Sequence, residues 1–194
     1  RAGIENAVAS MGTALTSEHV EHLKRFTKKV IVTYDGDKAG QAATAKALDE
    51  LKDLPVQVVQ IPDAMDPDEY LQKNSPQDLA YLLTNTRISP VEFYIHHFRP
   101  ENSENLQAQI EFIEKIAPLI AKEPSITAQN SYIHILTDHL PSFDYQQVEH
   151  IVNESRVRQR KEKVKETYSP SPVTMSVTKQ LTAVMRAEAH ILYR

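Results

Sequence analysis

The sequence predicts an α/β fold, a mainly parallel sheet with flanking helices, followed by an all-α helical region. Two runs of β-forming residues, Val30 to Tyr34 and Val56 to Ile61, are separated by an alanine-rich stretch with helical spacing. This order is typical of parallel strands joined by a helix. All four glycines lie within the first 40 residues, and the rest of the chain consists of helical patterns separated by prolines.

The composition is that of an ordinary soluble protein. Of the 194 residues, 41% are hydrophobic and 25% are charged, and the net charge of −4 excludes a uniformly basic nucleic-acid clamp. The lack of cysteine excludes a disulfide scaffold or a thiolate zinc site within this stretch. No run approaches the roughly 18 apolar residues of a membrane span. We therefore expect a cytoplasmic protein without membrane contacts.

The first elements alternate between strands and helices. Residues 6–11 are a short strand candidate, and Thr16 or Ser17 can cap the helix that follows. The apolar face expected for this helix consists of Val20, Leu23 and Phe26.

The two runs of β-forming residues enclose a second helix. The strand from Val30 to Tyr34 is expected to be buried on both faces. A helix is expected from Lys38 to Leu51, and the strand from Val56 to Ile61 completes the crossover. The residues of this helix that are expected to point inward are Ala42, Ala45 and Leu48.

Beyond residue 74 the sequence predicts only helices. Pro76 and Pro90 each follow a serine and mark the first positions of two helices. Apolar residues at helical spacing predict a third helix over 103–122. Two more are expected to begin at Pro124 and, after Pro141, near residue 144. We expect four parts: an α/β subdomain at 1–85, a helical subdomain at 86–166, a linker at 167–176 and a truncated helical domain at 177–194.

Acidic side chains concentrate between residues 35 and 70, where nine acidic and three basic residues give a local charge of −6. Several of them occupy two loops, each of which follows a predicted strand. Because the carboxyl ends of parallel strands meet at one edge of a sheet, we expect Asp35 and Asp37 to lie near Asp66 and Asp68. Carboxylate oxygens arranged in this way suit Mg²⁺.

Each acidic loop also has a purely structural interpretation. Asp37 can cap the helix that begins at Lys38, and Asp66-Pro67-Asp68-Glu69 can be a complete helix start. Capping does not explain Asp35 at the end of its strand. The presence of both loops at equivalent strand ends favours the metal site.

Three motifs in this order resemble the TOPRIM region of bacterial DNA primases of the DnaG type. They are Ala9 to Thr16, Tyr34 to Gly40, and Leu54 to Ile61 leading into Asp66-Pro67-Asp68-Glu69. The resemblance covers residues 2 to 73 and implies a partial TOPRIM fold. The later residues resemble, less specifically, the helical subdomain of that family's polymerase core and the start of its helicase-interacting domain.

The resemblance implies a DNA primase, a nucleotidyltransferase that synthesises short RNA primers on single-stranded DNA at the replication fork. The implied partners are the template strand, ribonucleoside triphosphates and the replicative DNA helicase. Asp35 and Asp37 match the catalytic metal ligands, Asp66 and Asp68 match further acids of the site, and the implied metal is Mg²⁺ or Mn²⁺. Zn²⁺ is expected only in an N-terminal domain that this sequence lacks.

The family's Glu-Gly-x-x-Asp motif lies upstream of the stretch that this chain matches. The chain begins with Arg1 rather than methionine. We therefore expect a fragment of a primase that is inactive alone.

Two groups of basic residues are candidates for nucleic-acid contacts. Lys38 is adjacent to the acidic pair and can contact a nucleotide phosphate. A later basic run can contact template phosphates, or it can be a solvated helix end. Its candidate residues are Arg156, Arg158, Arg160 and Lys161.

Two other functions share these features. A different TOPRIM enzyme, such as a nuclease or topoisomerase, has the same acids, but the long helical tail argues against a compact nuclease. A non-catalytic helical adaptor would keep the acids only as helix caps, and would show no specific site for Mn²⁺.

Overall fold

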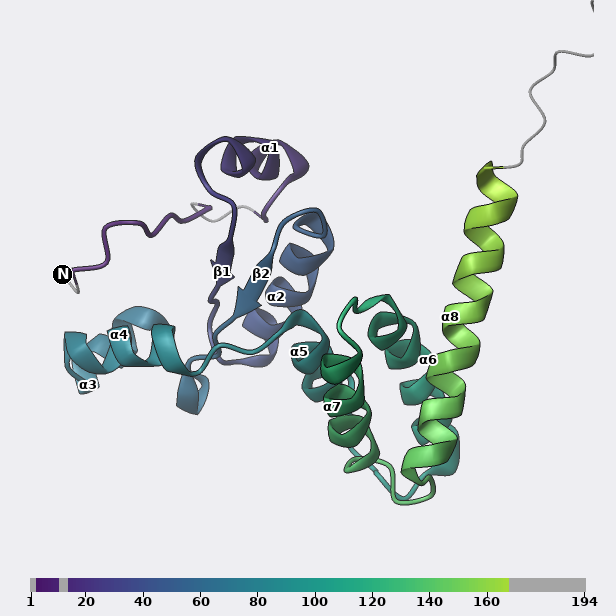
Figure 1. Cartoon of the computed structure of the whole chain (residues 1–194). Helices are drawn as coiled ribbons and strands as arrows, with labels where there is room; N and C mark the ends of the chain where they lie inside the picture. Colours follow the sequence, from purple (N-terminus) through teal and green to yellow (C-terminus); the bar gives the residue numbers. More distant parts are fainter. Residues whose placement is uncertain (1–2, 11–13, 168–194) are drawn as a thin grey trace, which may run out of the picture. The chain divides into compact units, whose positions relative to one another are not determined.

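The computed structural model describes residues 3–10 and 14–167, with side chains described as far as residue 162 (Figure 1). Residues 1–153 form one compact unit, and residue 154 begins a second. The elements are α1 (Ser17–Phe26), β1 (Val30–Val32), α2 (Lys38–Glu50), β2 (Val56–Val58), η1 (Pro62–Ala64), α3 (Pro67–Lys73), α4 (Pro76–Asn85), α5 (Pro90–Phe98), α6 (Leu106–Lys122), α7 (Ile126–Thr137) and α8 (Tyr145–Thr167). The predicted linker, apart from Thr167, and the predicted terminal helix lie outside the described residues, and the predicted domain boundaries stay predictions.

The sheet is parallel, as the sequence predicts. β1 and β2 pair in the register Val30↔Val56 and Val32↔Val58, and α2 forms the connection between them. Ile88 adds an isolated antiparallel bridge to Val58 on the other side of β2. The described residues thus form a small α/β layer followed by helices, which confirms the expected fold class.

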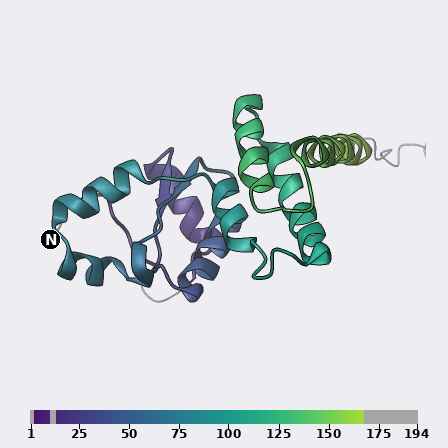
Figure 2. The ribbon, with the colours of Figure 1, turned by 90° about the horizontal axis from the view of Figure 1, so that it is seen from below.

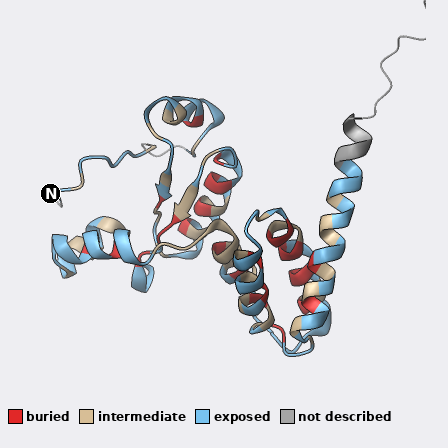
Figure 3. Ribbon diagram, in the orientation of Figure 1, coloured by how far each residue is buried: buried red, intermediate tan, exposed pale blue. Residues whose placement is uncertain are grey.

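One core of the α/β part includes β1, α1 and the end of α2. Val32 of β1 packs with Val20 of α1 and with Ala47 and Leu51 at the end of α2. Figure 3 shows buried positions of α2 along one side of the helix. The buried residues of α2 are Gly40, Thr44, Ala47 and Leu48.

The predicted inward face of α2 is wrong at one position. Ala42 is exposed, because it lies about 200° around the helix from Gly40, which begins the buried side. Leu48 is buried as expected and packs with Val58 and Phe93. A helix with this much alanine has no single apolar stripe, so its sequence defines the buried face poorly.

Three other expectations about the N-terminal elements are wrong. Residues 6–10 contain no strand, because alanine, serine and asparagine form strands poorly. Ile31 is 37% exposed, since α1 and α2 pack on the opposite face of β1. Phe26 is 84% exposed, because it is the last residue of α1 and extends past the cluster around Val20.

Side-chain caps begin three helices where the sequence predicts them, but the helix expected to begin at Pro124 begins at Ile126, because Ser125 caps it by accepting a hydrogen bond from Ala128 N. Ser75 caps α4 and Ser89 caps α5, each followed by proline at the first helical position. Thr16 caps α1 in a capping box, in which Nδ1 of His19 accepts a hydrogen bond from the Thr16 N–H at 3.3 Å. His19 therefore completes the capping box at the start of α1.

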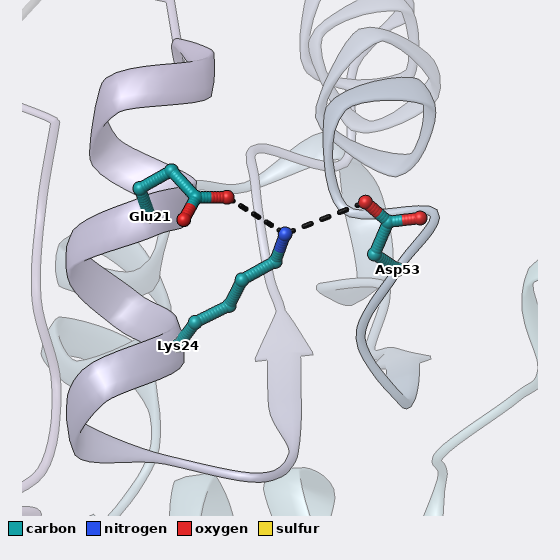
Figure 4. Close-up of polar contacts among 3 residues, drawn as sticks. All are labelled: Glu21, Lys24 and Asp53. Atoms are coloured by element: carbon teal, nitrogen blue, oxygen red, sulfur yellow. Dashed lines mark hydrogen bonds and ion pairs between the residues drawn. The ribbon is translucent and has the colours of Figure 1, made fainter.

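An ion-pair cluster connects α1 to the loop after α2 (Figure 4). The Lys24 ammonium lies 2.8 Å from Glu21 Oε1 and 3.4 Å from Asp53 Oδ2. The hydrogen bond that the Lys24 ammonium donates to Glu21 is the main cause of the raised pKa of Lys24. The cluster holds α1 beside the end of α2.

Helices α5, α6 and α7, together with the first part of α8, enclose the larger core. Figures 1 and 2 show α6 and α7 side by side. Ile95, Ile116 and Leu136 are fully buried in this core. Gln109 is also fully buried, and its side chain bonds to Ser103 O at 2.8 Å and to Ser142 N at 3.1 Å. None of the helices in the described ranges combines the length and apolar character needed to cross a membrane.

Candidate metal centre at two acidic turns

The first acidic turn, Asp35-Gly36-Asp37, lies between β1 and α2. Asp37 caps α2, with Oδ1 accepting a hydrogen bond from Gly40 N at 2.6 Å. Asp35 is exposed, and its side chain forms no hydrogen bond or ion pair with any described residue. The cap thus explains Asp37 but not Asp35, as the sequence indicated.

The second acidic turn follows β2 and ends in a capping box. Asp66 Oδ1 accepts hydrogen bonds from the N–H groups of Asp68 at 2.7 Å and Glu69 at 2.8 Å. Glu69 Oε2 accepts in return from Asp66 N at 3.4 Å. Asp68 Oδ2 accepts from Gln72 Nε2 at 3.0 Å. The helix start predicted from Asp66 to Glu69 is therefore present.

The structure brings the backbones of the two turns into contact. Gly36 N donates a hydrogen bond to Met65 O at 3.1 Å. A Cβ at Gly36 would lie 2.3 Å from Ile61 O and 3.0 Å from the Cα of Ala64, so only glycine allows this approach. Met65 is buried in an apolar cluster with Ile61 and anchors the second turn by packing.

The second turn contains two non-glycine residues in the left-handed region. Asp63 has φ 56° and Ala64 has φ 54°. Such residues each cost about 1–2 kcal/mol relative to a right-handed conformation. The hydrogen bonds from Met65 N to Pro62 O and from Gly36 N to Met65 O hold this conformation. Strain at a turn of this kind is typical of functional sites, and here it is adjacent to Asp66.

The four aspartates do not form a closed carboxylate cage. Among the described residues, no three side chains of histidine, aspartate or glutamate gather closely enough to hold a metal ion. Their chemistry still fits Mg²⁺, which commonly binds one or two carboxylates and takes its other ligands from water and phosphate oxygens. Asp37 and Asp66 each cap a helix through Oδ1, and Oδ2 accepts no hydrogen bond from any described residue. Capping and metal binding are therefore compatible in both residues.

The basic candidates lie in different environments. Lys38 is 96% exposed and lies 3.6 Å from Oε1 of the equally exposed Glu101. Such an exposed pair contributes little and is easily exchanged for another anion.

The later basic run lies on α8, in the second unit. Arg158, Arg160 and Lys161 are exposed, and Arg156 is half-buried. At 3.6 residues per turn these positions are distributed around the helix rather than along one face. The run therefore gives a diffuse positive charge and no single basic surface.

Sequence reasoning missed one segment that contacts both strand–turn elements. Ile88 bridges β2, and the Tyr94 hydroxyl donates to Ala45 O at 3.3 Å and to Asp49 Oδ1 at 3.2 Å. Burial and the neighbouring Asp49 raise the pKa of Tyr94. No local pattern in the sequence could pair Tyr94 with a helix 45 residues earlier.

Comparison with known proteins agrees with this geometry. Residues 1–71 match the family model described as Toprim-like. The chain is 52% identical over 153 residues to a DNA primase of Lactococcus lactis, covering 79% of this chain and 24% of that protein. It is 39% identical over 141 residues to a DNA primase of Listeria monocytogenes, covering 71% of this chain and 22% of the relative.

Solved structures show the same fold. The catalytic core of DnaG matches with a TM-score of 0.54 at 26% identity, over 76% of this chain and 49% of that one. The DnaG primase catalytic domain bound to ssDNA matches with a TM-score of 0.55 at 28% identity, and the match covers 75% of this chain and 47% of that one. The RNA polymerase domain of Mycobacterium tuberculosis primase DnaG matches with a TM-score of 0.56 at 30% identity, and the match covers 71% of this chain and 45% of that one.

The parallel strands with acidic turns at their carboxyl ends are those of a Toprim-like protein. Together with its relatives and structural neighbours, this fold places the chain in the DnaG-type family of bacterial DNA primases. The chain spans about a quarter of the length of these two curated relatives.

Proposed function

We propose that this chain supplies the divalent-metal site of a DNA primase, the enzyme that joins ribonucleotides into short primers on a single-stranded DNA template. Family membership supports the reaction class, nucleotidyl transfer. The observation that carries the proposal is the backbone contact between the two acidic turns, with Gly36 N bonded to Met65 O. This contact places four aspartates on two adjoining turns at the carboxyl ends of neighbouring parallel strands.

In this proposal Asp35 and Asp37 bind the metal, and Asp66 and Asp68 bind it or orient its water ligands. Bound Mg²⁺ or Mn²⁺ would offset the negative charge that builds on phosphate oxygens during nucleotidyl transfer. The cation is required because carboxylates alone repel a triphosphate.

The chain's own residues hold these carboxylates in place. Asp37 and Asp66 are fixed by hydrogen bonds from the first turns of α2 and α3, where the helix dipole favours negative charge. Gly36 keeps the turns in contact, and Asp35 remains exposed to solvent. Lys38, one residue after the cap of α2, can exchange its exposed pairing with Glu101 for a nucleotide phosphate.

The proposed partners are the template strand, ribonucleoside triphosphates and the replicative DNA helicase. A structural neighbour described as bound to ssDNA supports the template as a partner. The proposed template contacts on α8 are Arg156, Arg158, Arg160 and Lys161. The helicase contact is proposed for residues 177–194, which lie outside the described residues.

Titration of the chain with Mn²⁺, followed by electron paramagnetic resonance, tests the site. Asn is as good a helix cap as Asp, so Asp37→Asn removes a charge and keeps α2 intact. We expect it to weaken Mn²⁺ binding by at least about tenfold. Asp138→Asn, at an exposed position after α7, is the matched control and should bind Mn²⁺ like the unaltered chain.

The same experiment tests the adaptor alternative. Because Asp37 and Asp66 do cap helices, an adaptor that uses them only as caps is consistent with their hydrogen bonds. Such a protein would show the same Mn²⁺ binding with and without Asp37→Asn. In a complete primase carrying this sequence, normal primer synthesis by an Asp35→Asn variant would exclude Asp35 as a ligand.

A further inference from the structure

The segment from Ile88 to Tyr94 contacts both elements that lead to the acidic turns. Ile88 exchanges two backbone hydrogen bonds of 2.9 Å with Val58, the last residue of β2. Phe93 is fully buried and packs with Val58 and with Leu48 of α2. The start of the helical region is therefore attached to the strand before the second turn and to the helix after the first.

Tyr94 adds two hydrogen bonds to this apolar and backbone contact. Its hydroxyl donates to Ala45 O at 3.3 Å and to Asp49 Oδ1 at 3.2 Å, both in the second half of α2. Its ring stacks on Phe98 with centroids 5.6 Å apart and planes 2° from parallel. Lys115 of α6 lies 4.0 Å from the centre of the Phe98 ring on α5. The Tyr94 side chain is thus supported from the helical core on one side and bonded to α2 on the other.

The axial position of α2 decides where Asp37 lies. The remaining contacts of α2 in this region are apolar, through Ala47, Leu48 and Leu51. Apolar contacts are non-directional and tolerate small sliding movements, whereas a hydrogen bond weakens steeply when its distance and angle change. A shift of α2 along its axis would move Asp37 relative to the second turn, which follows β2.

We infer that Tyr94 is a positioning residue for the metal centre: its hydroxyl fixes α2 relative to β2 and so sets the separation of the two acidic turns. This role rests on the proposed metal-binding function. Through Tyr94, α5 would contribute to the geometry of the metal site, although Tyr94 contacts none of the four aspartates.

Mn²⁺ affinity of Tyr94→Phe tests the inference, because this variant keeps the ring and removes only the hydroxyl. We expect affinity to fall by about two- to twelvefold, the range that corresponds to the net effect of one hydrogen bond. Tyr132→Phe is the matched control. Tyr132 packs against the helical core, its hydroxyl bonds to no described residue, and its variant should bind Mn²⁺ normally.

Two variants of the acceptor complete the test. Asp49→Asn keeps an acceptor oxygen for Tyr94 and should retain Mn²⁺ affinity. Asp49→Ala leaves Ala45 O as the remaining acceptor and should show a smaller loss than Tyr94→Phe. Urea denaturation of the same proteins separates positioning from stability. A Tyr94→Phe protein that is less stable but binds Mn²⁺ normally would overturn the inference.

The failure of the inference and the failure of the proposed function give different results. If Asp37→Asn weakens Mn²⁺ binding and Tyr94→Phe does not, the metal site stands and the positioning role is wrong. If Asp37→Asn leaves Mn²⁺ binding unchanged, the proposed function is wrong and the positioning role falls with it.

Discussion

Gly40 lies in the first turn of α2, directly against the backbone of Asp35. A Cβ at Gly40 would lie 2.1 Å from Asp35 O, 2.7 Å from Asp35 C and 2.9 Å from Asp35 N. These are backbone atoms, which cannot turn away as the end of a flexible side chain can. Gly40 N also donates the hydrogen bond to Asp37 Oδ1. Replacing Gly40 with alanine therefore perturbs both aspartates of the first turn.

Two opposing effects decide the stability of Gly40→Ala. Alanine is favoured over glycine within a helix by about 1 kcal/mol. Overpacking against fixed neighbours costs about 1–3 kcal/mol, and a contact as short as 2.1 Å belongs at the upper end of that range. We expect the free energy of unfolding to decrease by about 2 kcal/mol, opposite in sign to the helix-propensity effect.

Urea denaturation followed by far-ultraviolet circular dichroism measures this change. Ala42→Gly is the control, because Ala42 is exposed in the same helix and reports the local helix propensity alone. It should destabilise the protein by about 1 kcal/mol. Mn²⁺ affinity should fall in Gly40→Ala, since Asp35 must move, and should stay unchanged in Ala42→Gly.

The sign of the change makes the outcome decisive. Suppose that Gly40→Ala raised the free energy of unfolding by about as much as Ala42→Gly lowered it. Helix propensity alone would then explain both variants, and α2 could not approach Asp35 as closely as described. The account of how the first acidic turn is held would then be wrong.

Three further predictions concern the strained turn, the buried glutamine and the histidines. Ala64→Gly should raise the free energy of unfolding in urea by about 1 kcal/mol, because glycine adopts a φ of 54° without steric strain; an unchanged midpoint would contradict this. Gln109→Leu should lower the free energy of unfolding by about 2 kcal/mol, since the leucine side chain leaves Ser103 O and Ser142 N without their hydrogen-bond partner. Burial lowers the pKa of His97 and His139, each with help from a nearby cation, so the folded state binds their protons more weakly than the unfolded chain. Thermal stability should therefore be complete above the ordinary histidine pKa of 6.5 and decrease as the pH falls below it, with a flatter profile in a variant carrying glutamine at both positions.

The starts of α4 and α5 could be predicted because their causes are local. Ser75 and Ser89 each precede a proline, and both the cap and the fixed φ of proline act within one turn. The same reasoning offered a helix start at Asp66, with proline at the first helical position. The acidic turns were predicted to meet because the order of strand, helix and strand determines which strand ends are neighbours.

The buried faces were harder to predict than the elements. Alanine is more apolar than threonine, yet Ala42 is exposed and Thr44 is buried, because the packing of α2 decides which side of the helix is covered. Ile31 was expected to be covered because of its hydrophobicity, yet α1 and α2 both pack on the other face of β1. Hydrophobicity alone specifies which residues can be buried, and the position of neighbouring elements specifies which are.

The sequence by itself determined the helices, the two parallel strands and the acidic residues that follow them, because these depend on neighbours within a few residues. Tertiary structure alone decided the contact of Gly36 with Met65, the close approach of Gly40 to Asp35, and the bond from Tyr94 to Asp49. These contacts join residues far apart in the chain, and they form only when packed elements bring specific atoms to within hydrogen-bonding or van der Waals distance. No local pattern carries that information.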